Sequence, residues 1–114
     1  MAGRWCIDCP PALQIFQDAS EVLGYDLLAV CTNGPSEKLN TTAVSQPALL
    51  VTSLAMLDVL LRREDTPFAE NREEFFTAGL SLGEYSALVH AGALDVQSAV
   101  RIVDVRGRAM QACA

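Results

Sequence analysis

Apolar residues recur at three- and four-residue spacing over two long stretches of the chain, which is the spacing of amphipathic helices. The first predicted helix covers residues 11–23: a Pro-Pro pair opens it, and Gly24 follows where a left-handed cap is favoured. The second predicted helix is capped by Ser45 or Gln46, starts at Pro47 and runs to about residue 62, with leucines at 50, 54, 57 and 61.

Two connections separate these helices from each other and from the rest of the chain. Residues 25–31 form a short apolar segment, and Asn33-Gly34-Pro35 then makes a loop with turn residues. Eight of the thirteen residues from 62 to 74 are charged, and Pro67 and Asn71 interrupt any helix there. We expect a solvated connection at residues 62–74.

The pattern changes after residue 74. The run from Phe75 to Leu80 predicts a short buried strand that leads directly into Ser81. A helix follows and stops at Gly92, and Asp95 caps a last helix whose apolar positions fall within an arc of about 100°. A strand, a tight turn and a helix in this order place the chain in the α/β class.

The composition favours a single folded domain. With 114 residues, of which 51% are hydrophobic and 19% charged, the chain is too apolar for a disordered tail and long enough for one core. Its net charge of −6 repels a phosphate backbone and argues against nucleic acid as a partner. The apolar run from Val44 to Leu57 is shorter than the about 20 residues that cross a bilayer, so no transmembrane helix or membrane partner is expected. The N-terminus lacks the apolar core of a signal peptide, and a cytoplasmic location is the default, with an organelle as the alternative.

Four cysteines stand at positions 6, 9, 31 and 113. The spacing Cys6-x-x-Cys9 occurs in zinc half-sites and in redox pairs. A zinc site would need a second such pair or two histidines, and the sequence has neither. The pattern alone leaves the role of Cys6 and Cys9 open.

The candidate chemistry is concentrated in the G-x-S-x-G pentapeptide at residues 79–83. In a nucleophile elbow a buried strand leads to the serine, a helix follows it, and glycines leave room for a sharp turn. The elements predicted around Ser81 meet these conditions. Ser81 would lie at a helix N-terminus, where backbone N–H groups stabilise the anion formed by attack on a carbonyl. The alternative is that Ser81 only caps the helix that follows.

A serine nucleophile needs a base to remove its proton. His90 is the only histidine, and it lies nine residues after Ser81 on the same predicted helix, about 13 Å along the axis and outside hydrogen-bond reach. We therefore expect His90 to be a surface or helix-end residue. Either the general base is absent from these 114 residues, as in a part of a larger enzyme, or an unusual Asp or Glu replaces the histidine.

Four separated segments resemble, in the same order, the malonyl-CoA:acyl carrier protein transacylases of the acyltransferase domain family. They are LGYDLL at 23–28, NGPSEKLNTTAVSQPALLVTSLA at 33–55, AGLSLGEYSALVHAGAL at 78–94 and VRGRAMQ at 105–111. The resemblance covers about residues 11–113. It implies a non-matching N-terminal extension at 1–10 and, at 11–114, a helix-rich fragment of the α/β-hydrolase-like large subdomain with a strand–nucleophile elbow–helix unit.

The resemblance also implies a reaction. A serine takes a malonyl group from malonyl-CoA and passes it to the phosphopantetheine thiol of acyl carrier protein, in fatty acid or polyketide biosynthesis and without a metal or redox cofactor. By position, Ser81 matches the nucleophile, the Leu82 backbone N–H an oxyanion donor, Arg106 the clamp for the malonyl carboxylate, and Gln46 a polar neighbour of the site. The family's N-terminal strand with its G-Q-G segment is missing, as is the downstream half with the general-base histidine and the small subdomain.

The position of Arg106 can also be judged from helical geometry. With Val103 at the centre of the apolar stripe of the last helix, Arg106 lies about 60° away, whereas Arg101 and Arg108 lie about 140–160° away. Arg106 therefore borders the buried side, where its charge needs a carboxylate partner. That partner is either malonate or an internal acid such as Glu84.

Two other functions stay open. A serine esterase or thioesterase of the α/β-hydrolase type carries the same pentapeptide, although a hydrolase needs no buried arginine for an acyl carboxylate. A non-catalytic truncated domain would keep the fold without activity. We expect the isolated chain to lack appreciable transacylase turnover, because the base and one oxyanion donor are absent.

Overall fold

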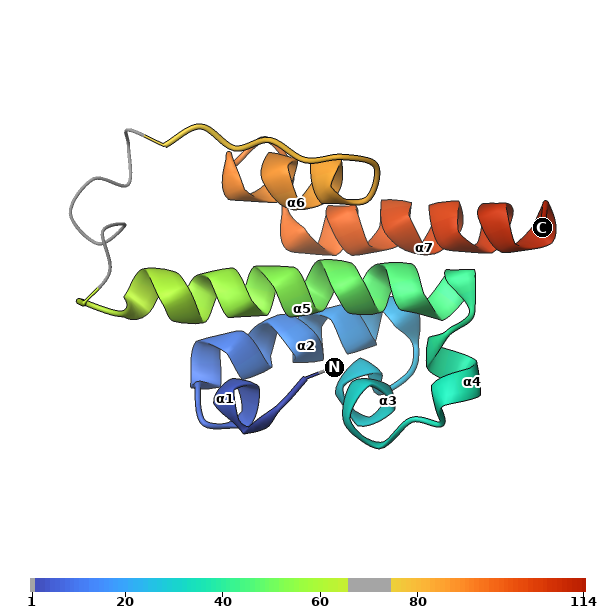
Figure 1. Cartoon of the computed structure of the whole chain (residues 1–114), viewed down its shortest axis with the longest axis horizontal. Coiled ribbons are helices and arrows are strands. Elements are labelled where there is room, and N and C mark those ends of the chain that lie inside the picture. The colour runs from blue at the N-terminus through green and yellow to red at the C-terminus, as the bar shows by residue number, and fades with distance from the viewer. Residues whose placement is uncertain (1, 66–74) are drawn as a thin grey trace.

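In a computed structural model of the chain, described for residues 2–65 and 75–114, the helices are arranged around one long central helix, α5 (Thr42–Arg62) (Figure 1). One side of α5 is covered by α1 (Arg4–Ile7), α2 (Pro10–Leu23), α3 (Leu27–Asn33) and α4 (Ser36–Leu39). The other side is covered by α6 (Gly83–His90) and α7 (Val96–Ala112). The core lies where α2, α5 and α7 meet, around the buried side chains of Phe16, Leu50, Val51, Val100 and Val103.

The first predicted helix is confirmed as α2. It starts with the Pro-Pro pair and ends at Gly24, which has a φ of 75° and donates its N–H to the Ser20 carbonyl at 2.9 Å. The Ser20 hydroxyl accepts the N–H of Leu27 at 3.0 Å and so ties the start of α3 to α2. The short apolar segment at 25–31 contributes most of α3, which begins because the Asp26 carboxylate accepts the Ala29 N–H at 2.9 Å.

The start of the second predicted helix is wrong by one turn. The helix α5 begins at Thr42, so Pro47 lies inside it and neither Ser45 nor Gln46 is its cap. The extra turn forms because Thr41 accepts the Ser45 N–H at 2.8 Å, and the Thr42 N–H finds the Gln111 side-chain oxygen on α7 at 2.7 Å. Because Gln111 lies on another helix, 69 residues away, the sequence around Thr42 does not predict this hydrogen bond.

The length of α5 also exceeds the expectation from the apolar run alone. It has 21 residues, and its most apolar 18-residue window has a mean hydropathy of 1.7, so by length and composition alone it would suffice to cross a membrane. Eight of these residues are buried, and they pack against α2 and α7. Of its most apolar 18-residue window, 44% is buried, so part of the apolar surface of α5 belongs to the core.

The strand predicted at Phe75–Leu80 is not found. Within residues 2–65 and 75–114 all regular secondary structure is helical, and the segment 75–80 runs alongside α6 without strand pairing (Figure 1). A strand requires a neighbouring strand for its backbone hydrogen bonds, and the described residues supply none. Instead, the Thr77 hydroxyl donates to the Ala87 carbonyl at 3.1 Å. Phe76 and Leu80, predicted to be buried, are fully or almost fully exposed, at 102% and 90%.

The last two predicted helices are confirmed as α6 and α7. The Asp95 carboxylate caps α7 by accepting the Ser98 N–H at 2.9 Å. Of the predicted solvated connection, Arg63 to Asp65 are exposed, whereas Pro67 and Asn71 lie outside the described residues.

Candidate functional site

Ser81 lies on an exposed tight turn just before α6. Its φ of 56° is in the left-handed region, which is uncommon for any residue except glycine. Gly79 makes the turn feasible, because a Cβ there would lie 2.1 Å from the carbonyl carbon and oxygen of Gly83. A Cβ on Gly83 would meet nothing within 4 Å. In the described part of the chain, only the first glycine of the pentapeptide is therefore required for steric reasons.

The hydrogen bonds of this turn use the backbone N–H groups of Ser81 and Gly83 but not that of Leu82. The Ser81 N–H donates to the Glu84 carboxylate at 3.1 Å, and the Gly83 N–H donates to the Leu80 carbonyl at 3.0 Å. Leu82 is the N-cap of α6, and its N–H has no acceptor among residues 2–65 and 75–114. A free N–H at a helix N-terminus suits a developing negative charge on a ligand.

A close crossing of α5 and α7 brings the other predicted site residues to this turn. At the crossing, a Cβ on Gly107 would lie 2.9 Å from the Thr42 carbonyl oxygen and 3.2 Å from the Ala43 Cα. Glycine at 107 thus permits a helix spacing that a side chain would prevent. The residue before it, Arg106, and Gln46, one turn after Thr42, face each other across the contact.

Arg106 links the three elements. One terminal nitrogen of its guanidinium donates to the Ser81 Oγ at 2.7 Å, and the other donates to the Gln46 Oε1. The guanidinium carbon also lies 5.9 Å from the centroid of the Tyr85 ring on α6, within the range of a cation–π contact. Arg106 is therefore in direct contact with both Gln46 and Ser81, which lie 60 and 25 residues before it in the sequence.

The charge of Arg106 is not neutralised by an acid in the described residues. The ion pairs found there join Arg62 with Asp58, Arg63 with Asp65, and Arg108 with Asp104. Glu84, the internal acid considered from the sequence, binds the Ser81 N–H instead. A guanidinium has five N–H donors and Arg106 is half-buried, so it keeps donors for an anionic ligand. As helical geometry predicts, Arg101 and Arg108 are exposed.

Met110 and Tyr85 contact this cluster and were not identified as site residues from the sequence. The Gln46 Nε2 donates to the Met110 Sδ at 3.2 Å; Gln46 is buried, whereas Met110 is exposed. Because sulfur can only accept, this contact turns the amide so that its oxygen faces Arg106. The available signal for Met110 was spacing, because it lies four residues after Arg106 on the same face of the last helix. Tyr85 is four residues after Ser81, but Ser81 lies before the helix, so helical spacing gives no signal for that contact.

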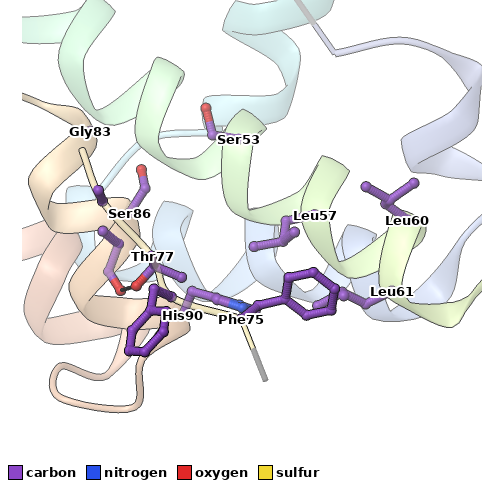
Figure 2. Close-up of a pocket in the computed structure, with 12 residues that line it drawn as sticks. Ser53, Leu57, Leu60, Leu61, Phe75, Thr77, Gly83, Ser86 and His90 are labelled. Carbon is purple, nitrogen blue, oxygen red and sulfur yellow. Dashed lines mark hydrogen bonds between the residues drawn. The ribbon is translucent and has the colours of Figure 1, made fainter. Parts of the chain in front are cut away.

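His90 belongs to a different feature. It is the last residue of α6 and is exposed, as expected from its spacing. It lines an apolar groove of about 470 Å³ between the second half of α5, residues 75–78 and α6 (Figure 2). Ser81, Gln46 and Arg106 are not among the residues that line this groove. Within residues 2–65 and 75–114, no group of three or more metal-ligating side chains is arranged to hold an ion.

Comparisons with known proteins point to one family. A family model described as the acyl transferase domain matches residues 16–114. The chain is 52% identical over 103 residues to a probable mitochondrial malonyl-CoA-acyl carrier protein transacylase of Drosophila melanogaster, an alignment that covers 90% of this chain and 26% of that protein. It is 46% identical over 111 residues to the malonyl CoA-acyl carrier protein transacylase of Haemophilus influenzae, covering 97% of this chain and 34% of that protein.

A solved structure extends the likeness to the fold. It is a malonyl-transacylase in complex with its type II polyketide synthase acyl-carrier protein. The sequence identity is 42%, the TM-score is 0.75, and the alignment covers 96% of this chain and 33% of that one. The chain thus spans about a third or less of the length of these relatives.

Proposed function

Because the chain belongs to the acyl transferase domain family, we propose that it forms part of an enzyme that transfers a malonyl group from malonyl-CoA to the phosphopantetheine thiol of acyl carrier protein. The observation that carries this proposal is the hydrogen bond of 2.7 Å from the Arg106 guanidinium to the Ser81 Oγ. This bond joins the Arg106 cation to a serine on a strained turn. Within the described residues, no acidic side chain forms an ion pair with Arg106.

The distance between cation and nucleophile favours a short acyl group with its own carboxylate. In a malonyl thioester the carboxylate is separated from the carbonyl carbon by a single methylene. A substrate whose carboxylate pairs with Arg106 would therefore have its carbonyl carbon next to Ser81 Oγ. An acetyl group would leave the guanidinium unpaired, and a longer dicarboxylic acyl group would place its carbonyl carbon farther from the serine.

The proposed reaction has two acyl transfers at one serine. The Ser81 Oγ loses its proton and attacks the thioester carbonyl carbon, the carbon–sulfur bond breaks, and coenzyme A leaves as a thiol. The thiol of acyl carrier protein then attacks the acyl-serine ester, and Ser81 regains a proton. During both steps the Leu82 N–H would donate to the oxyanion, as in the nucleophile elbow of α/β-hydrolase-like folds.

The base is the part of this mechanism that the described residues do not supply. His90 lies at the opposite end of α6, about 12 Å from its start, and lines the apolar groove. Glu84 is engaged by the Ser81 backbone N–H. We propose that the proton acceptor comes from a part of the protein outside this sequence, so that the 114 residues alone do not turn over.

The partners and the pathway follow from the same proposal. One related transacylase structure is a complex with an acyl-carrier protein of polyketide synthesis. We propose acyl carrier protein as the acceptor for this chain as well, in fatty acid or polyketide synthesis. The Drosophila relative is described as mitochondrial, and the cytoplasmic location expected from the sequence stays a prediction.

The test uses a chimera in which the 111 aligned residues of this chain replace their counterparts in the Haemophilus influenzae relative. On incubation with malonyl-CoA we expect a malonyl adduct on Ser81, and transfer of that group to acyl carrier protein. Ser81→Ala should abolish both, while the control Ser86→Ala, on α6 directly after this turn, should keep them. Hydrolysis without transfer to the carrier would favour the esterase or thioesterase alternative. A folded chimera without any adduct would favour a non-catalytic domain.

A further inference from the structure

Cys6 and Cys9 take no part in the proposed site, and the fold brings them together where α1 meets α2. Cys6 lies in the only turn of α1, and Cys9 is the N-cap of α2. The Cys9 N–H donates to the Cys6 carbonyl at 3.3 Å and closes a four-residue turn. The first and fourth Cα atoms of such a turn are less than about 7 Å apart, and a disulfide needs about 4.4–6.8 Å. The backbone therefore permits a bond between the two sulfurs.

The two thiols differ in accessibility. Cys6 is fully buried in the core, whereas Cys9 is partly exposed and packs against the same core. Burial raises the pKa of the Cys6 thiol, and negative charge on Cys9 and then on Cys31 raises it further. Cys6 and Cys9 are thus within electrostatic range of each other. A dissolved reagent therefore reaches the Cys9 thiol first, and the buried Cys6 thiol can react only in the second step.

We propose that Cys6 and Cys9 form a reversible dithiol–disulfide pair that reacts with a small-molecule disulfide of the glutathione type. The Cys9 thiolate attacks one sulfur of the reagent, the S–S bond of the reagent breaks, and one glutathione thiolate leaves. The Cys6 sulfur then gives up its proton, attacks the Cys9 sulfur and releases the second glutathione thiolate. The two protein thiols are oxidised, the reagent is reduced to two thiols, and the two protons go to the leaving thiolates.

Cys31 and Cys113 are the competing partners within the described residues. Cys31 is buried in α3, 25 positions after Cys6, and burial raises the pKa of its thiol. No backbone turn links it to Cys6 as the turn links Cys9. Cys113 is exposed at the end of α7 and is available for bonds between two molecules. These residues provide matched controls.

The experiment equilibrates the purified chain with reduced and oxidised glutathione, blocks the remaining thiols with an alkylating reagent, and maps the bonds by mass spectrometry. We expect loss of two hydrogen masses in the peptide that contains both Cys6 and Cys9, and reversal by dithiothreitol. Cys9→Ala should abolish this product, and Cys6→Ala should trap one glutathionyl group on Cys9. Cys31→Ala and Cys113→Ala should form the same disulfide as the parent chain.

Further outcomes decide against the proposal. A Cys6–Cys31 bond, only intermolecular bonds through Cys113, or a glutathionyl group that stays on Cys9 in the parent chain would each overturn it. To show that the fold drives the reaction, the titration is repeated in concentrated urea. The pair should then need a higher ratio of oxidised to reduced glutathione, and equal ratios with and without urea would refute a role for the folded turn. None of these readouts depends on acyl transfer, so they are independent of the proposed enzymatic function.

Discussion

Replacement of Arg106 by alanine is the sharpest test of how the substrate is selected. The variant removes the guanidinium that contacts Ser81 and Gln46. The measurement is kcat/KM of the chimera for malonyl-CoA and for acetyl-CoA with the same carrier protein. We expect a loss for malonyl-CoA and an unchanged or higher value for acetyl-CoA.

The size of the loss follows from the exposure of the residue. A hydrogen bond to an ionised group contributes about 1.5–3 kcal/mol. Arg106 is half-buried, so water replaces part of the lost interaction, and we take the same range for the whole bidentate pair. This converts to a decrease of about 10- to 150-fold in kcat/KM for malonyl-CoA.

Two variants separate recognition from structure. Arg106→Lys keeps the charge but not the planar fork, and should give an intermediate loss. Arg108→Ala removes an exposed guanidinium that pairs with Asp104 on the same helix, and should leave the ratio of malonyl to acetyl transfer unchanged. Equal losses for both acyl donors in Arg106→Ala would mean that this arginine holds the helices together and does not choose the substrate.

Three further predictions concern the residues around the site and the helix that supports it. Met110→Leu keeps the side-chain volume but removes the acceptor of the Gln46 amide, so kcat/KM for malonyl-CoA should fall about 2- to 5-fold while that for acetyl-CoA stays unchanged. A parallel fall for both substrates would indicate that Met110 has a packing role only. Gly79→Ala places a Cβ against backbone and should lower the free energy of unfolding of the folded chimera by about 1–3 kcal/mol in denaturant titrations, whereas Gly83→Ala, with open space, should be neutral or stabilising. Two hydrogen bonds from Ser98 hold the pKa of Asp95 below its ordinary value of 3.8. The Asp95 cap therefore stabilises the fold fully above pH 3.8, and this stabilisation is lost as the pH falls through the lower pKa of the folded state. The difference in melting temperature between the chimera and its Asp95→Ala variant should shrink as the pH falls below 3.8, and a constant difference would contradict the cap.

The helices could be predicted because their signals are local. The spacing of apolar residues, the Pro-Pro pair before α2, the left-handed Gly24 and the Asp95 cap each act within one or two turns of chain. The same local reasoning placed Arg106 at the border of the buried face of α7. The family assignment is confirmed as well, since four separated segments each carry part of the pattern.

The errors arose where the deciding partner was distant in the sequence or lay outside the described residues. The first turn of α5 has a hydrogen-bond partner in Gln111, which is 69 residues away in the sequence and lies on another helix. The strand at Phe75–Leu80 was predicted from apolar character, but its backbone finds no neighbouring strand in the described residues. Met110 was not identified as a site residue because its contact with Gln46 depends on how α5 and α7 cross.

The crossing at Gly107 has a consequence for how this sequence can diverge. Any larger residue at 107 would press on the backbone of Thr42 and Ala43, and a shift of α5 there would carry Gln46 away from Arg106. A single methyl group would thus change helix spacing and acyl-group recognition in one mutational step. Natural variation at positions 42, 43 and 107 should therefore be correlated. Residues other than glycine at position 107 are expected only in related proteins that no longer prefer an acyl group with its own carboxylate.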